Sequence, residues 1–182
     1  MDLVLIRAFQ RQVKFQCECV LLATEQLNAA IPKRDITAIF CALQALLSSA
    51  ANISKALWSG RKTKNALASR AQLRASLHVP DASPLHPRTM RNHFDHYDER
   101  LDEWWKKSKG HSIADMNVMS RKAIQGLDDI DRLRAFDAQT ADVSFAGDDF
   151  NIHTIIDEVR RILPIVTQEA NKVPWEIKPK QP

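Results

Sequence analysis

The chain has 182 residues, of which 45% are hydrophobic and 26% are charged, as in an ordinary folded domain rather than a disordered or fibrous chain. Only 4 glycines and 1 tyrosine occur, which disfavours a large antiparallel sheet with its many turns and aromatic residues. The net charge of +4 is too small for a protein that binds nucleic acid through bulk charge alone. The composition therefore predicts a mostly α protein.

Two long helices are predicted in the first third of the chain. Apolar residues recur at three- and four-residue steps over residues 3–30, before Pro32. A second helix is expected to begin after Asp35, a plausible N-cap, and to end at Leu57 or Trp58. Its first 19 residues, 36–54, carry no charge, but they include several polar side chains. This polar content predicts a buried core helix rather than a membrane span.

A basic, acid-free stretch follows. No Asp or Glu occurs from Ile36 to Pro80, and a shorter helix is predicted for residues 63–77. The basic residues of this stretch are Lys55, Arg61, Lys62, Lys64, Arg70 and Arg74. They form either an ordinary solvated helix face or a track for phosphate groups.

A fourth helix is predicted from Pro87 to Lys107, after a proline-containing connection. At about 100° per residue, its apolar side chains form one stripe, and a separate polar face carries charged and amide groups. The polar residues on that face are Arg88, Arg91, Asn92, Asp95, His96, Glu99 and Glu103. Asn92 and His96 are one turn apart, with Arg91 adjacent, so groups suited to proton transfer and phosphate binding share a face that the core does not use.

The last part of the chain contains two short runs that could form strands, followed by a helical pattern. The runs Leu133–Phe136 and Asp142–Phe145 are expected either to form a short β-hairpin or to continue a helix. A final helix is predicted to open at residues 148–152 and to reach Ala170, with a kink at Pro164. The expected organisation is a single helical domain over residues 1–172, followed by an extended, proline-containing tail over 173–182.

Three cysteines, Cys17, Cys19 and Cys41, occur without the Cys-x-x-Cys spacing of zinc sites. They predict reduced thiols and a cytoplasmic protein, in keeping with the absence of a signal-peptide pattern at the amino terminus. A metal site at His93, Asp95 and His96 is disfavoured because the two histidines diverge around the helix. No metal and no cofactor are therefore expected.

The segment Arg91-Asn92-His93-Phe94-Asp95-His96 resembles the Arg-polar-x-x-x-His motif of HEPN domains (higher eukaryotes and prokaryotes nucleotide-binding). The order of elements is also similar, because HEPN domains are helical bundles with the motif late in the bundle and a final helix after it. The resemblance implies a metal-independent endoribonuclease, as found in toxin–antitoxin, phage-defence and CRISPR systems. Arg88 and His93 fit the same Arg-x4-His spacing, so the choice between the two pairs stays open.

The resemblance implies a role for each motif residue. His96 would serve in acid/base chemistry during attack by the RNA 2′-hydroxyl, and Arg91 would stabilise the phosphorane. Asn92 would orient either the histidine or the phosphate. The implied partners are RNA, a second copy of the chain bound through the motif helix, and an antitoxin or defence partner; no membrane is implied. The residues expected to bind RNA are Arg61, Lys62, Lys64, Arg70, Arg74 and Arg88. The alternative function is a catalytically silent helical dimerisation or interaction module.

Overall fold

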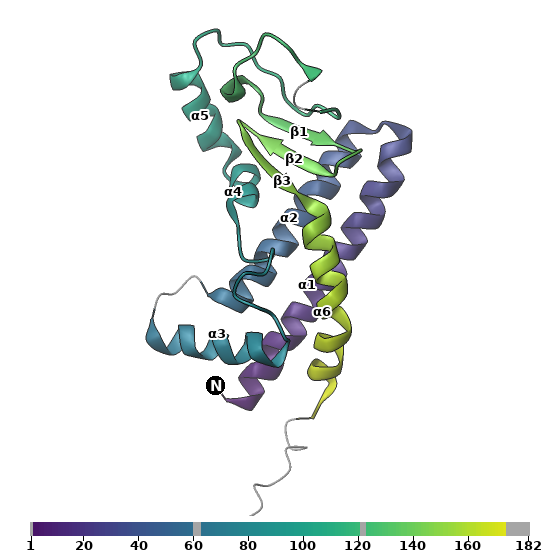
Figure 1. Ribbon diagram of the computed structural model, residues 1–182, viewed down its shortest axis with the longest axis vertical. Coiled ribbons are helices and arrows are strands. Elements are labelled where there is room, and N and C mark those ends of the chain that lie inside the picture. The colour runs from purple at the N-terminus through teal and green to yellow at the C-terminus, as the bar shows by residue number, and fades with distance from the viewer. Residues whose placement is uncertain (1, 60–62, 121–122, 174–182) are drawn as a thin grey trace, which may run out of the picture.

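Three long helices run along the length of the molecule in the computed structural model, which describes residues 2–59, 63–120 and 123–173 (Figure 1). These helices are α1 (Leu3–Ala30), α2 (Ile36–Trp58) and α6 (Ile152–Asn171). A 3₁₀ turn, η1 (Ile31–Lys33), joins α1 to α2, and Arg34 after it has a left-handed φ of 53°. The mostly α prediction is confirmed.

Local sequence explains where α1 and α2 begin. The Asp2 carboxylate accepts hydrogen bonds from the N–H groups of Val4 and Leu5 at the start of α1. The Asp35 carboxylate accepts one from Ala38, as the predicted N-cap of α2 should. These caps satisfy backbone donors that have no partner inside the helix. The predicted ends of α1 and α2 are confirmed.

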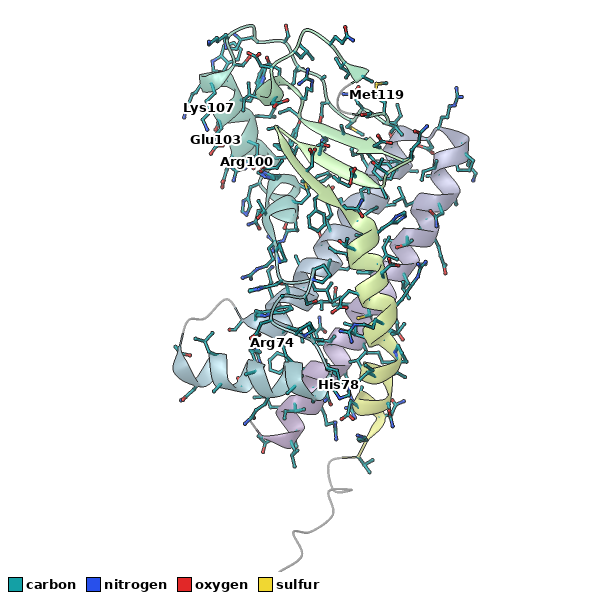
Figure 2. All side chains as sticks on the ribbon, viewed as in Figure 1. Arg74, His78, Arg100, Glu103, Lys107 and Met119 are labelled. Atoms are coloured by element: carbon teal, nitrogen blue, oxygen red, sulfur yellow. The ribbon has the colours of Figure 1, made fainter. Side chains whose placement is uncertain are left out.

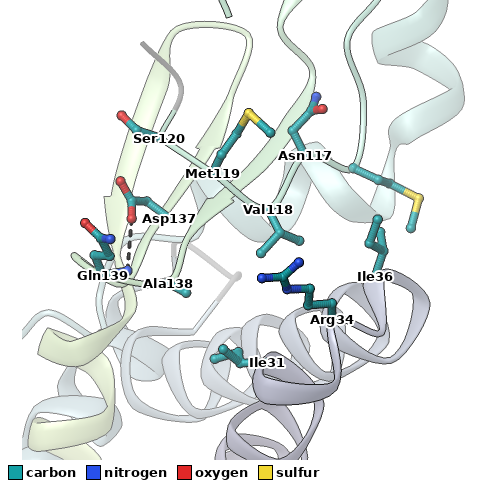
Figure 3. A pocket seen from close by; sticks show the side chains of 11 residues that line it. Ile31, Arg34, Ile36, Asn117, Val118, Met119, Ser120, Asp137, Ala138 and Gln139 are labelled. Atoms are coloured by element: carbon teal, nitrogen blue, oxygen red, sulfur yellow. Dashed lines mark hydrogen bonds between the residues drawn. The ribbon is translucent and has the colours of Figure 1, made fainter. Parts of the chain in front are cut away.

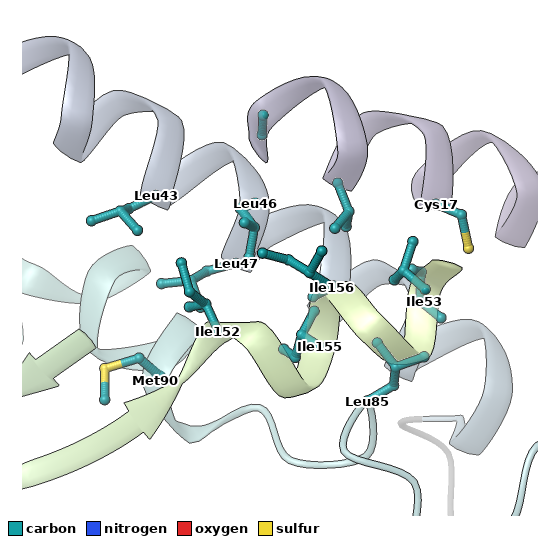
Figure 4. Packing of buried hydrophobic residues seen from close by; sticks show 14 of the residues in the cluster. Cys17, Leu43, Leu46, Leu47, Ile53, Leu85, Met90, Ile152, Ile155 and Ile156 are labelled. Carbon is teal, nitrogen blue, oxygen red and sulfur yellow. The ribbon is translucent and has the colours of Figure 1, made fainter. Parts of the chain in front are cut away.

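The core lies between α1, α2 and α6. Figure 4 shows Ile155 and Ile156 of α6 on the side that faces Leu46, Leu47 and Ile53 of α2. α6 buries the residues that recur along one of its faces, because a helix repeats every 3.6 residues. Its polar face stays in solvent. One hydrophobic cluster thus connects the three long helices.

α2 is the only helix of the described residues that is long and apolar enough to cross a membrane, with a mean hydropathy of 1.7 over its most apolar stretch. The central helix of a globular core meets the same criteria. Ile39, Leu43, Leu46, Ile53 and Leu57 are fully buried against the rest of the chain. The packing supports the prediction of a core helix.

Three shorter helices follow α2: α3 (Lys64–Ser76), α4 (Thr89–Asp95) and α5 (Tyr97–Lys107). α3 crosses one end of the long bundle, whereas α4 and α5 lie toward the other end (Figure 1). The helix predicted from Pro87 to Lys107 is wrong as a continuous element. It is divided at His96, whose φ of −110° and ψ of 42° are not helical.

A small antiparallel sheet precedes α6. Its strands are β1 (Arg134–Asp137), β2 (Asp142–Phe145) and β3 (Asp148–Asn151), in the order β1-β2-β3. The predicted hairpin is confirmed, with Ala135 opposite Ser144. The expected start of the last helix at 148–152 is partly wrong, because residues 148–151 form β3 and α6 begins at Ile152. The predicted tail lies, from residue 174 on, outside the described residues.

The buried and exposed leucines of the two long helices give a matched test of this fold. Leu46 is fully buried in α2, whereas Leu22 on α1 is 55% exposed. Leu46→Ala is expected to lower the free energy of unfolding by about 2–5 kcal/mol, because it leaves a cavity in the core. Leu22→Ala should change that free energy by less than about 0.5 kcal/mol. Denaturant titration followed by circular dichroism measures both values, and equal effects would contradict this core.

Candidate active site at the α4–α5 junction

The motif segment occupies α4 and its junction with α5. Met90 and Phe94 are buried against the core, so the opposite face of α4 is turned toward solvent. Asn92 and His96 are exposed on that side, whereas the Arg91 side chain is only 12% exposed. The predicted separation of an apolar stripe from a polar face therefore holds within α4.

Phe145 at the end of β2 holds α4 in place. Its ring, 1% exposed, stacks on His93 with centroids 4.8 Å apart and contacts Phe94 at 6.4 Å. Tyr97, the first residue of α5, packs edge-on against the same ring at 6.2 Å. Both short helices thus rest on one aromatic side chain, and His96 lies between the residues that make these contacts.

An ion pair between β1 and the segment after α5 fixes the start of α5. Asp115 accepts hydrogen bonds from Nε of Arg134 at 2.9 Å, from Nη2 of Arg134 at 2.5 Å and from the Tyr97 hydroxyl at 2.9 Å. The Arg134 guanidinium also lies over the Tyr97 ring, 4.1 Å from its centroid. Tyr97 must turn toward Asp115 and Phe145 to make these contacts, which gives a physical reason for the break at His96.

These contacts move two pKa values in opposite directions. Burial by itself raises the pKa of Asp115, but the hydrogen bonds from Arg134 and Tyr97 outweigh it and hold that pKa below its ordinary value. Burial, together with the hydrogen bond to Asp115, raises the pKa of Tyr97 to about 12. At neutral pH Asp115 is therefore charged and Tyr97 neutral.

Arg91 is anchored before any substrate binds. Its Nη1 lies 3.1 Å from Oδ2 of Asp95 and donates to Oδ1 of Asn92 at 3.1 Å. Ser48 of α2 donates a hydrogen bond of 3.5 Å to the other oxygen of Asp95. Arg91 and Asn92 are therefore in contact, as the motif reading requires, but part of the guanidinium is already paired with a carboxylate.

His96 is the more accessible member of the motif. Its side chain is 50% exposed, and its Nδ1 lies 3.4 Å from Oε1 of Glu99, one turn into α5. No partner of its Nε2 is found in the described part of the chain. Glu99 lies on the predicted polar face, three residues after the histidine, as neighbours on one side of a helix do.

The alternative pair, Arg88 and His93, is arranged differently. Nε2 of His93 lies 2.9 Å from Oδ2 of Asp148, and its ring is sandwiched against Phe145. Its Nδ1 is buried without a hydrogen-bond partner among the described residues. Arg88 is partly exposed and lines a small depression together with Arg91. Accessibility therefore favours His96 over His93 as the group that could reach a substrate.

The basic residues expected to bind RNA are distributed unevenly. The Arg70 guanidinium lies over the Phe9 ring, 3.6 Å from its centroid. Arg74 donates to the Leu57 carbonyl at 2.8 Å and pairs with Asp81 at 2.7 Å. Figure 2 shows Arg74 well away, along the long axis, from the α5 residues Arg100 and Glu103. Arg74 thus joins α3 to the end of α2, and Arg70 packs α3 against α1.

The remaining residues predicted to bind RNA are Arg61, Lys62, Lys64 and Arg88. Arg61 and Lys62 lie outside the described residues, and the side chain of Lys64 is likewise not described. Of the predicted set, only Arg88 adjoins the motif within the described ranges.

Among the described residues, no group of three or more His, Cys, Asp or Glu side chains could hold a metal ion. The cysteines are free, and burial raises the pKa of the Cys17 thiol to about 12, which keeps it protonated. Asp115 and Phe145, which position the junction, were not identified from the sequence. They are distant in the chain from residues 91–96, and no local spacing pattern connects them to the motif.

The chain was compared with protein-family models, curated proteins and solved structures, and none of them matches it.

The Asp115 network makes the junction sensitive to acid. Asp115→Asn should lower the free energy of unfolding by about 1–3 kcal/mol at neutral pH, since Arg134 loses its charged acceptor. A depressed pKa contributes stability that is complete above the unfolded value near pH 4 and is lost as the pH falls through the folded value. The difference between wild type and variant should therefore shrink in acid.

Urea titrations between about pH 2 and pH 7 measure this difference. Asp102→Asn, at an exposed position in the middle of α5, is the matched control and should leave the free energy of unfolding nearly unchanged. A stability difference for Asp115→Asn that does not vary with pH would contradict the assignment.

Proposed function

We propose that this protein is a metal-independent endoribonuclease of HEPN type, with its active site at the α4–α5 junction. The observation that carries the proposal is the arrangement at His96: a half-exposed imidazole with Nδ1 facing Glu99, directly after the turn that bears Arg91 and Asn92. A toxin or defence effector acting in the cytoplasm is the role that the HEPN resemblance favours.

The imidazole of His96 suits proton transfer. When Nδ1–H donates to Glu99, the lone pair of Nε2 is free to accept a proton. RNA supplies its own nucleophile: the 2′-oxygen forms a bond to phosphorus, and the bond to the 5′-oxygen breaks. The 2′-hydroxyl proton passes to a base, and an acid protonates the leaving 5′-oxygen, so the products are a 2′,3′-cyclic phosphate and a 5′-hydroxyl.

Arg91 and Asn92 suit the phosphate. Charge develops on the non-bridging oxygens in the transition state, and a guanidinium can donate two parallel hydrogen bonds to them. Asp95 holds Arg91 in a defined place, and the phosphate would compete with Asp95 for its donors. Asn92, exposed and bonded to Arg91 through its carbonyl oxygen, has an amide nitrogen left to donate.

A second copy of the chain would complete the chemistry. Base and acid are separate tasks, and one motif supplies a single accessible histidine. A two-fold dimer that apposes the exposed faces of α4 would bring both His96 side chains to one cleft. Arg88 adjoins this face and would contact the RNA backbone.

One observation favours the alternative function, a catalytically silent interaction module. Arg91 is paired with Asp95 and mostly buried, and Arg70 and Arg74 are used in internal packing. In such a module the motif residues would stabilise α4 rather than bind phosphate. Cleavage assays on variants separate the two functions.

His96→Ala is expected to lower RNA cleavage in the presence of a chelator by at least about 100-fold, because general acid–base catalysis is lost. Arg91→Gln should lower kcat to a similar degree, since the positive charge acts on the transition state. Gel assays on a labelled RNA measure the rates, and circular dichroism checks folding.

His153→Gln is the control, because His153 is an exposed histidine of α6 away from the motif segment. Its activity should equal that of the wild type. Full activity of His96→Ala would contradict the role of His96 in cleavage, whereas wild-type protein that cleaves no RNA would favour the silent module.

The dimer makes a separate prediction. Light scattering at micromolar concentration should give twice 20.7 kDa. An excess of His96→Ala subunits mixed with the wild type should lower the activity of the wild-type chains, because a mixed dimer holds only one of the two histidines that the shared cleft needs. An equal excess of His153→Gln subunits should not lower it. A monomeric protein that still cleaves RNA would contradict the shared cleft.

A further inference from the structure

A second groove among the described residues lies away from the α4–α5 junction. A strand-like segment around Asn117 runs parallel to β1: the Asn117 N–H donates to the Arg134 carbonyl at 3.1 Å, and the Phe136 N–H donates to the Asn117 carbonyl at 2.8 Å. After Asn117 the segment leaves β1, and a groove of about 810 Å³ opens between residues 118–120 and residues 137–139. This volume is in the range of small-molecule sites.

One side of the groove is formed by the turn between α1 and α2. Figure 3 shows the Arg34 side chain reaching from this turn toward Val118, with Ile31 and Ile36 on either side. The guanidinium of Arg34 has no acceptor among the described residues. The adjacent carboxylate of Asp35 accepts from the Ala38 N–H, so it is used as a helix cap instead. The Arg34 guanidinium therefore lies beside apolar walls of the groove with no ion pair to another described residue.

The backbone holds these walls in uncommon conformations. Arg34 and Met116, both lining the groove, have left-handed φ values of 53° and 55°. Residues with side chains rarely adopt this region, and such residues gather at binding sites. The methionines of this segment, Met116 and Met119, have flexible and polarisable side chains that adapt to a flat apolar surface.

The charge of the groove is asymmetric. Asp137 lies on the side opposite to Arg34, and its Oδ1 accepts the Gln139 N–H at 2.9 Å (Figure 3). A ligand with one anionic group is attracted at the Arg34 end, whereas a second anionic group near Asp137 is repelled. A nucleic-acid backbone, with a charge on every phosphate, fits this pattern poorly.

We infer that this groove binds a small organic molecule with one anionic head group, paired with Arg34, and an apolar or aromatic body that lies against Ile31, Ile36, Val118, Met116 and Met119. The site is independent of the proposed ribonuclease activity. A carboxylate, a sulfonate or a monoester phosphate can each supply the head group, because a guanidinium pairs with all three through two parallel hydrogen bonds.

Methionine methyl signals give a direct test. The chain has 4 methionines, of which Met116 and Met119 line the groove and Met90 is buried in the core. Protein labelled with ¹³C at the methionine methyls is titrated with 8-anilinonaphthalene-1-sulfonate, an aromatic monoanion. The signals of Met116 and Met119 are expected to shift in a saturable way, while that of Met90 stays in place.

The charge of Arg34 is tested with a matched pair of variants. Arg34→Gln is expected to weaken binding of the sulfonate by at least about tenfold, because a charge-assisted contact is lost. Lys33→Gln removes a neighbouring exposed charge that does not line the groove, and it should leave the affinity unchanged. Arg34→Lys keeps the charge but loses the two parallel donors, so its affinity should lie between those of the wild type and Arg34→Gln.

Two further probes separate the parts of the ligand. N-phenyl-1-naphthylamine, which lacks the sulfonate, should bind more weakly than the sulfonate and with the same affinity in wild type and Arg34→Gln. Inorganic phosphate, which lacks the apolar body, should not shift Met116 or Met119 at millimolar concentration. The inference is overturned if the sulfonate does not bind, if Met90 shifts as much as Met116 and Met119, or if Arg34→Gln binds it like the wild type.

Discussion

The ring of Phe145 is the contact on which the arrangement of the candidate active site depends. It lies at the end of β2, fully buried, and it receives His93, Phe94 and Tyr97 from two successive helices. Aromatic pairs of this kind add about 0.5–1.5 kcal/mol each beyond the area that they bury. Because α4 has only 7 residues, it depends on such tertiary contacts for its position and its stability.

A second set of contacts, formed by charged and polar groups, positions α5 together with the aromatic contacts. Asp115, Arg134 and Tyr97 connect the segment after α5, the first strand and the start of α5. The charged pair is only partly buried, so its desolvation cost is moderate, and both Asp115 oxygens and the Tyr97 hydroxyl have hydrogen-bond partners. The exposed His96 lies next to Tyr97, so this network sets the direction in which α5 leaves the motif. The sheet, although small, therefore positions the site.

The number of arginines in a segment does not say how many of them are free to bind a ligand. An acid-free stretch of sequence suggests a surface prepared for phosphate, yet Arg70 covers Phe9 and Arg74 satisfies the carbonyl of Leu57 at the end of α2. A guanidinium combines a flat face with several donors, so it serves packing and hydrogen bonding at once. Arg34 is the opposite case, because its charge has no partner within the described ranges and faces a groove.

The sequence by itself determined the elements whose causes are local. Helical periodicity with Asp2 and Asp35 as caps set α1 and α2, whereas the runs 133–136 and 142–145 allowed either a hairpin or a helix. It also determined that Asn92 and His96 lie on the side of the motif helix opposite to Phe94. Such features follow from the spacing of a few neighbouring residues, which the sequence displays directly.

Only the tertiary structure decided the break at His96, the third strand and the groove beside Arg34. The break depends on Tyr97 meeting Asp115 and Phe145, which lie 18 and 48 residues further along the chain. β3 has the polar sequence Asp148–Asn151, and it becomes a strand because β2 offers it hydrogen bonds. The groove depends on the point at which the segment around Asn117 separates from β1. These contacts join residues far apart in the chain, so no local sequence pattern predicts them.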